Sequence, residues 1–164
     1  MSAPQKAMLL CAGRGERMRP LSESCPKPLL PLNGKPLLVR SLDRLEEFGV
    51  GEVVVNLHHL GEMIRAYLAP RPAPALVFSE EKELLDTGGG VAKALSHFGN
   101  EAFYVINGDI LWGEGKASSL GALAAFWREG EMDALLLLQP REKATGYEGA
   151  GDYSFKEAAE AYCL

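Results

Sequence analysis

Short apolar segments alternate along the chain with longer segments whose apolar residues recur at helical spacing. The short segments are rich in Val, Ile, Leu and Phe, and their length is that of buried strands. In the longer segments the apolar side chains recur every three or four residues, as on one face of a helix. The pattern predicts strands near 6–11, 52–56, 75–79, 102–107 and 133–139, and helices from Pro36 to Gly49, near 60–68, from the glycines at 88–90 to Phe98, and near 118–129.

This alternation predicts an α/β fold. Strands that alternate with helices favour a three-layer α/β/α arrangement around a mostly parallel, Rossmann-like sheet. A length of 164 residues is that of one ordinary domain, so we expect residues 1–164 to form a single domain. The proline-rich segment 70–74 is then a stiff connector rather than a boundary between domains.

Charge and cysteine usage exclude several classes of partner. The net charge of −5 argues against binding nucleic acid or anionic lipid through a field of the whole protein, so we expect neither a nucleic-acid nor a membrane partner. Any anion site must therefore be local. Three cysteines without CxxC or Cys/His spacing argue against a disulfide framework or a zinc site, and the N-terminal apolar run is too short for a signal peptide. We expect a cytoplasmic protein.

Three segments follow predicted strands and carry residues suited to ligand binding. In an open α/β sheet, ligands bind at the carboxyl ends of the strands, where loops and helix N-termini direct N–H groups outward. The three segments are the loop at 12–20, the cluster Asp86–Gly90, and Asn107–Asp109. The adjacent His58 and His59 form a weaker candidate, because neighbouring residues direct their side chains apart and a shared metal is disfavoured.

The first of these loops, GRGERMRP, holds two glycines and three arginines. A Rossmann fingerprint would need a third glycine where this chain has Met18, and a Walker loop would need a Lys-Ser/Thr pair that is missing. What remains is a backbone free of side chains at Gly13 and Gly15, so that N–H groups can face phosphate oxygens near the arginines. A plain surface turn with solvated arginines is the alternative.

Residues beyond this loop favour the phosphate interpretation. Lys27 lies between two prolines and is therefore held on a rigid extended segment. The stretch LLCAGRGERMRPLSESCPKPLLPLNGKPL resembles the N-terminal signature of the sugar-1-phosphate nucleotidyltransferases. The segments LDTGGG, ending at Gly90, and FYVINGD, ending at Asp109, support the resemblance downstream.

The resemblance implies a fold of the nucleotide-diphospho-sugar transferase type and a set of site residues. It implies that Arg17, Lys27 and Asp109 are catalytic and that Asp109 also binds Mg²⁺. It further implies that the nucleotide is bound by Leu10, Ala12, Gly13, Arg14, Gly15, Glu83, Thr87, Gly88 and Gly89. The chemistry agrees, because nucleotidyl transfer depends on positioning and charge neutralisation, and a carboxylate is a suitable ligand for Mg²⁺.

The implied substrates are a nucleoside triphosphate and a sugar 1-phosphate. The likeness favours the enzymes that make UDP-N-acetylmuramic acid from N-acetylmuramate 1-phosphate, or related mannose-1-phosphate guanylyltransferase-like proteins. Members of the family continue well beyond the point at which this sequence stops, so we expect the C-terminal part to be truncated, with much of the sugar-binding portion missing. The alternative is a truncated or diverged nucleotide-binding module with little or no catalysis. The nucleotide, the sugar and the oligomeric state stay open.

Overall fold

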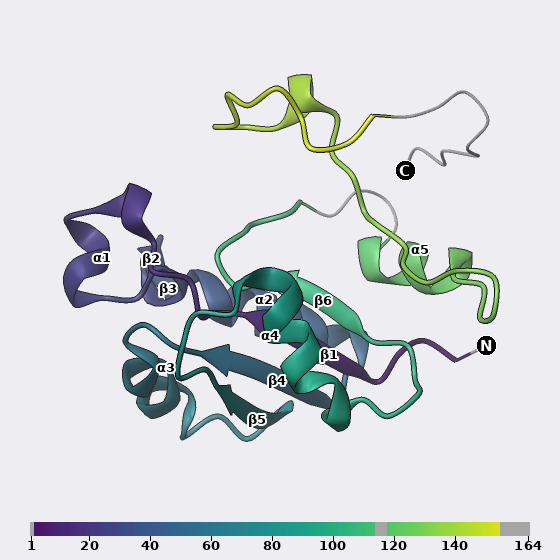
Figure 1. The fold of residues 1–164 in the computed structure, drawn as a ribbon, viewed down its shortest axis with the longest axis horizontal. Coiled ribbons are helices and arrows are strands. Elements are labelled where there is room, and N and C mark those ends of the chain that lie inside the picture. Colours follow the sequence, from purple (N-terminus) through teal and green to yellow (C-terminus); the bar gives the residue numbers. More distant parts are fainter. Residues whose placement is uncertain (1, 114–117, 155–164) are drawn as a thin grey trace. The chain divides into compact units, whose positions relative to one another are not determined.

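The computed structural model describes residues 2–113 and 118–154, and the chain divides into two compact units, Met1–Gly113 and Glu114–Leu164. The first unit holds the sheet (Figure 1). Its elements are, in chain order, β1 (Lys6–Leu10), the 3-10 turn η1 (Glu16–Met18), α1 (Leu21–Ser24), η2 (Lys27–Leu29), β2 (Pro31–Leu32), β3 (Lys35–Pro36), α2 (Leu37–Phe48), β4 (Glu52–Leu57), α3 (Gly61–Leu68), β5 (Ala75–Glu80), α4 (Asp86–Ala94), η3 (Leu95–His97) and β6 (Tyr104–Asn107).

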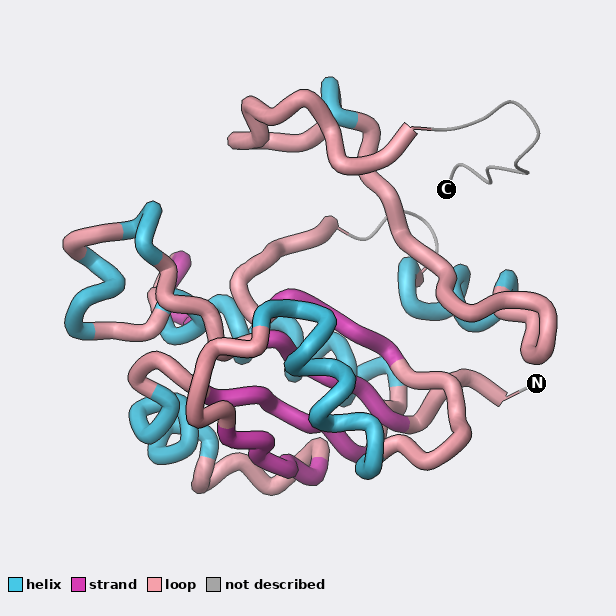
Figure 2. Tube along the Cα trace, viewed as in Figure 1, coloured by secondary structure: helices cyan, strands magenta, loops and turns pink. Residues whose placement is uncertain are grey.

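The main sheet has four strands in the order β5-β4-β1-β6, and each neighbouring pair is parallel. Helices lie on both sides of it (Figures 1 and 2). The chain moves outward from β1 to β4 and β5 and then returns to the other edge as β6, so right-handed crossovers put α2 and α3 on one face and α4 on the other. The three-layer α/β/α fold expected from the sequence is confirmed.

One face of the sheet packs against α4. Met8 and Val54 from the two central strands form a fully buried cluster with Ala94 and Phe98. The Phe98 ring stacks on Phe103, with 3.7 Å between the ring centroids. Because α4 follows β5 and leads to the parallel strand β6, its N-terminus lies at the carboxyl ends of the strands.

The opposite face is covered by α2 and α3. Alternation along β1 directs Ala7 and Leu9 away from α4, and both are completely buried. The apolar stripes of the two helices supply the buried side chains of this layer, which are Leu38, Leu42, Leu45, Ile64 and Leu68. Gly49 ends α2 with a positive φ of 96°, as expected from the sequence.

A group of charged residues ties α2 to the segment after α3. Arg71 donates hydrogen bonds to Asp43 at 3.0 Å and to Glu46 at 2.5 Å, and Lys35 also pairs with Asp43. Burial by itself would raise the pKa of Asp43, but the hydrogen bonds and charges of Lys35 and Arg71 lower it below its ordinary value. The carboxylate is therefore better stabilised in the folded chain than in the unfolded one.

The second unit contains α5 (Ser119–Phe126) and the 3-10 turn η4 (Arg141–Lys143). Ser118 caps α5, since its hydroxyl accepts a hydrogen bond from the Gly121 amide. Elsewhere the described backbone of this unit is irregular.

The strand predicted at 133–139 is wrong, because this segment has irregular backbone. Leu136 and Leu137 are about half exposed, so the apolar run has no buried face. A strand exists only through hydrogen bonds to a neighbouring strand, and the described residues of the second unit contain none. Apolar composition over seven residues was therefore an insufficient signal.

Candidate active site

The neighbouring carboxyl ends of β1 and β6 bring two of the three predicted segments together. Leu10, the last residue of β1, is level with Asn56 of β4 on one side and Asn107 of β6 on the other. The arginine-rich loop leaves from β1 at this point, and Gly108 and Asp109 leave from β6. The partly buried Leu10 side chain itself packs against the core under α4.

Lys27 and Asp109 form an ion pair. Lys27 Nζ donates a hydrogen bond to Asp109 Oδ2 at 2.5 Å, and both side chains stay partly exposed, at 26% and 31%. Lys27 begins the short 3-10 turn η2 between Pro26 and Pro28, both of which are buried, so the extended segment predicted for this lysine is wrong. Two residues of opposite charge that were predicted to be catalytic are thus in direct contact.

Gly108 brings the end of β6 against the end of β1. Its amide donates to the Leu10 carbonyl at 2.9 Å, and a Cβ at this position would lie 2.4 Å from Cys11 Sγ. Glycine is required here for close packing between strand ends. Burial, with a contribution from the charge of Asp109, raises the pKa of the Cys11 thiol well above its usual value, so this cysteine is a neutral core residue.

The loop after β1 leaves its two glycines in different environments. Gly15 has a left-handed φ of 64°, and its carbonyl accepts a hydrogen bond from the buried Ser22 hydroxyl at 2.8 Å. A Cβ on Gly13 would meet nothing within 4 Å, so open space adjoins that backbone. Ala12, just before it, is buried. The loop is therefore anchored at Gly15 and accessible at Gly13.

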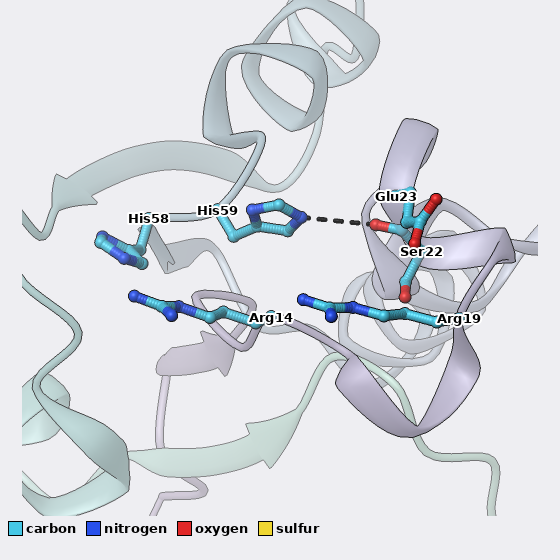
Figure 3. A pocket seen from close by; sticks show the side chains of 6 residues that line it. All are labelled: Arg14, Arg19, Ser22, Glu23, His58 and His59. Carbon is cyan, nitrogen blue, oxygen red and sulfur yellow. Dashed lines mark hydrogen bonds between the residues drawn. The ribbon is translucent and has the colours of Figure 1, made fainter.

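The arginines of this loop do not act as one group. Arg14 and Arg19 line a hollow of about 440 Å³ together with Ser22, Glu23, His58 and His59. Figure 3 shows both guanidinium groups directed to the same side as the two histidines. Arg17 belongs to the turn η1 and is exposed, and it is not among the residues that line this hollow.

The two histidines make separate hydrogen bonds. His58 Nδ1 lies 2.9 Å from the Glu81 carbonyl oxygen, and His59 Nε2 lies 3.3 Å from the Ser22 carbonyl oxygen. Over residues 2–113 and 118–154, no three His, Cys, Asp or Glu side chains come together in a way that could hold a metal ion. Among these residues, a cation at Asp109 would take most of its ligands from water and substrate.

The segment 83–89 leads into the N-terminus of α4. Glu83 and Leu85 line a second hollow, of about 390 Å³, and the Thr87 amide donates to Asp86 Oδ1 at 3.0 Å. Gly88 is exposed and Gly89 is half-buried on the first turn of the helix. A Cβ at Gly88 would meet nothing within 4 Å, whereas a Cβ at Gly89 would lie 2.9 Å from Leu85 Cβ. Backbone without side-chain cover is therefore offered at Gly88.

Two buried polar residues next to the site, Asn56 and Glu81, were not predicted from the sequence, and their exposed fractions are 3% and 5%. Asn56 Oδ1 accepts a hydrogen bond from the Cys11 amide at 2.7 Å, and its Nδ2 donates to Glu81 Oε1 at 2.8 Å. An asparagine in the otherwise apolar run VVVNL was the signal that could have identified this pair, because buried polar side chains need specific partners.

None of the helices in the described residues has the length and apolar character needed to cross a membrane.

Comparison with known proteins assigns this arrangement to a family. Residues 7–141 match the MobA-like NTP transferase domain. The chain is 37% identical over 171 aligned residues to N-acetylmuramate alpha-1-phosphate uridylyltransferase of Caulobacter vibrioides, a match covering 96% of this chain and 71% of that protein. It is 46% identical over 109 residues to the protein of the same name from Neisseria meningitidis serogroup B, covering 65% of this chain and 47% of that protein.

A solved structure shares the fold. The structure of UDP-glucose pyrophosphorylase in complex with UDP-glucose superposes with a TM-score of 0.66 at 21% identity, covering 74% of this chain and 52% of that one. The resemblance inferred from the loop after β1, Lys27 and Asp109 is confirmed at the level of the family. The chain belongs to the MobA-like NTP transferase domain family, a family of nucleotidyltransferases.

Proposed function

We propose that this chain forms the nucleotide-binding part of an enzyme that transfers a nucleotidyl group from a nucleoside triphosphate to a sugar 1-phosphate. An oxygen of the sugar phosphate attacks the α-phosphorus and forms a new P–O bond. The bond between the α-phosphorus and the bridging oxygen to the β-phosphorus breaks, and pyrophosphate leaves with the electron pair. The products are a nucleotide-sugar and pyrophosphate.

The observation that carries this proposal is the Lys27–Asp109 pair at 2.5 Å, beside an open glycine loop at the carboxyl end of the sheet. Nucleotidyl transfer needs fixed charges around the phosphates more than covalent participation by the protein. Lys27 neutralises charge on the phosphates, and its position between two buried prolines limits how far it moves. Arg17, which is exposed on the same loop, provides a second cation for the triphosphate.

We assign the rest of the nucleotide to two backbone segments. The open backbone at Gly13, with Leu10 and the buried Ala12 before it and Arg14 and Gly15 after it, lies along the ribose and phosphates. The segment from Glu83 through Thr87 to Gly89 contacts the base, because a flat ring can approach backbone that has no Cβ in the way. The accessible space at Gly13 and Gly88 supports both assignments.

We propose Mg²⁺ as the cofactor, with Asp109 as its protein ligand. The side chain fits this role in part: it is a hard carboxylate, it is partly exposed, and only Oδ2 is engaged by Lys27. A single carboxylate is enough for Mg²⁺ when phosphate oxygens and water complete its coordination. Bound there, Mg²⁺ would offset negative charge on the phosphates of the substrate.

The substrates we favour are UTP and N-acetylmuramate 1-phosphate or a related hexose 1-phosphate. Support comes from the two curated relatives, both named for a uridylyltransferase activity on N-acetylmuramate 1-phosphate, at 37% and 46% identity. A cytoplasmic location would supply the nucleoside triphosphate, and free thiols at Cys11 and Cys25 suit a reducing compartment.

The test has two arms. Calorimetry of the purified chain with UTP, GTP and dTTP, each with and without Mg²⁺, should show one preferred triphosphate whose binding is strengthened by the metal. Pyrophosphate detection with that triphosphate and a panel of sugar 1-phosphates should then show turnover. Binding without turnover on any sugar phosphate would support a nucleotide-binding module instead, and no binding of any triphosphate would reject both functions.

A further inference from the structure

Asn56 and Glu81 form a buried polar bridge between two separate loops. Asn56 lies near the end of β4, and Glu81 directly follows β5. The Cys11 amide donates to Asn56 Oδ1 at 2.7 Å, Asn56 Nδ2 donates to Glu81 Oε1 at 2.8 Å, and the Leu85 amide donates to Glu81 Oε2 at 3.0 Å. Three hydrogen bonds in series thus connect the backbone at Cys11 to the backbone at Leu85.

The two ends of this bridge lie at the two parts of the proposed nucleotide site. Cys11 immediately precedes the loop assigned to the ribose and phosphates. Leu85 lies within the segment assigned to the base and is the residue before α4. A ligand that contacts both segments binds more tightly if their separation is already fixed in the free protein. If the segments had to be ordered on binding, the cost would weaken the affinity.

The surroundings hold the bridge rigidly. The Glu81 amide donates to the Leu57 carbonyl at 2.7 Å, and the Glu81 carbonyl oxygen lies 2.9 Å from His58 Nδ1. Gly90 of helix α4 packs directly against the bridge, since a Cβ at this position would lie 2.8 Å from Glu81 Oε1 and 2.9 Å from Asn56 Nδ2. Glu81 is therefore fixed through its backbone and through both carboxylate oxygens.

We propose that Asn56 and Glu81 are positioning residues that set the distance between the phosphate loop and the base segment, so that a nucleoside triphosphate meets both in register. This inference rests on the proposed function. Neither side chain touches the substrate. Their effect on affinity is transmitted through the backbone at Cys11 and Leu85.

The polarity of the bridge allows a test by exchange of chemical groups. Asn56→Asp places a carboxylate oxygen against Glu81 Oε1, and Glu81→Gln leaves one N–H facing another N–H at one of its two contacts. In the double variant Asn56→Asp/Glu81→Gln, Asp accepts from the Cys11 amide and from the Gln amide, while the Gln oxygen accepts from the Leu85 amide. All three hydrogen bonds return with the central one reversed, and the net charge equals that of the wild type.

The experiment measures triphosphate binding and amide exchange on the wild type, the two single variants and the double variant. Calorimetry with UTP, GTP and dTTP in the presence of Mg²⁺ should show binding weakened about tenfold or more in each single variant and restored to within about threefold in the double variant. Hydrogen exchange should show the Cys11 and Leu85 amides losing protection in the single variants and regaining it in the double variant. The control is Asn107→Asp, the same change at the residue of β6 that pairs with Leu10. It should leave the Leu85 amide protected.

Two results would overturn the inference. One is wild-type affinity in folded single variants whose Cys11 and Leu85 amides have lost protection, since the bridge would then serve stability alone. The other is a double variant that binds as weakly as the worse single variant. If one single variant fails to fold, the other single variant and the double variant decide the inference by the same two criteria. If the wild type binds no triphosphate while its Cys11 and Leu85 amides are protected, the proposed function is contradicted. The hydrogen-bonded bridge between the two loops would still be confirmed.

Discussion

Lys27 Nζ donates a hydrogen bond to Asp109 Oδ2 at 2.5 Å, across 82 positions of sequence. The lysine is presented by a proline-bounded turn and the aspartate by the end of β6. Both side chains keep more than a quarter of their surface exposed, so a substrate phosphate can approach them. In the absence of substrate each charge is compensated by the other.

Removing either member of this pair should abolish most of the catalysis. Because both charges act on the phosphates, Lys27→Ala and Asp109→Ala should each lower kcat by about 10²–10³-fold in a pyrophosphate-release assay. Lys143→Ala and Asp152→Ala are matched controls in the second unit, where both residues are exposed, and they should retain wild-type rates. Full activity in Lys27→Ala or Asp109→Ala would show that the pair takes no part in catalysis.

The exposed Arg17 should contribute to triphosphate affinity through its charge. Arg17→Ala should weaken triphosphate binding about tenfold at low salt, and the difference from wild type should shrink as ionic strength rises. Calorimetry at several salt concentrations measures both effects, with the exposed Arg128→Ala as the control. A loss seen in Arg14→Ala or Arg19→Ala but not in Arg17→Ala would move the site to the hollow that those two arginines line.

Glycines at the site should separate into those needed for folding and those needed for binding. Gly108→Ala would put a Cβ 2.4 Å from Cys11 Sγ and 3.1 Å from the Leu10 carbonyl oxygen, so it should cost about 1–3 kcal/mol in urea unfolding. Gly88→Ala meets no neighbour and lies in a helix, so its stability should equal or exceed that of the wild type.

Triphosphate affinity tests the second half of this claim. If the base packs against Gly88, the alanine variant should be stable and bind more weakly. Unchanged affinity in Gly88→Ala would show that the base lies elsewhere.

Much of the fold follows from local patterns in the sequence. The strands β1, β4, β5 and β6 coincide with apolar runs, and Gly49 ends α2 where helix-stop chemistry predicts. The segment 133–139 has a similar composition but remains irregular, because a strand depends on a partner that local sequence does not specify. The strands predicted from apolar runs are therefore present where a neighbouring strand pairs with them.

The part of the candidate site that follows the ends of β1 and β6 could be predicted from the sequence. Lys27 and Asp109 were selected for charge and position, and they form an ion pair between the turn η2 and the end of β6. Asn56 and Glu81 were missed because their importance lies in contacts with each other and with two distant backbone amides. The common hollow of Arg14 and Arg19 was not predicted, because it depends on the 3-10 turn that residues 16–18 form between them.

The charged group around Asp43 should make stability depend on pH. Its pKa is lowered in the folded chain, so its contribution is fully present above the unfolded value of about 4 and is lost as pH falls through the folded value. Arg71→Met should cost about 1 kcal/mol at neutral pH, and the difference from wild type should narrow below about pH 4. Urea unfolding of both proteins across this range is the measurement, and a constant difference down to acid pH would contradict the assignment.

The central claim is that this chain binds a nucleoside triphosphate for transfer of its α-phosphate to a sugar phosphate. The most direct measurement uses UTP labelled in its α-phosphate, with Mg²⁺ and N-acetylmuramate 1-phosphate, followed by separation of the products. The label should appear in a nucleotide-sugar, with one pyrophosphate released for each nucleotide-sugar formed, and Asp109→Ala should form neither. Label recovered only in UTP, with this sugar phosphate and with other hexose 1-phosphates, would contradict the claim.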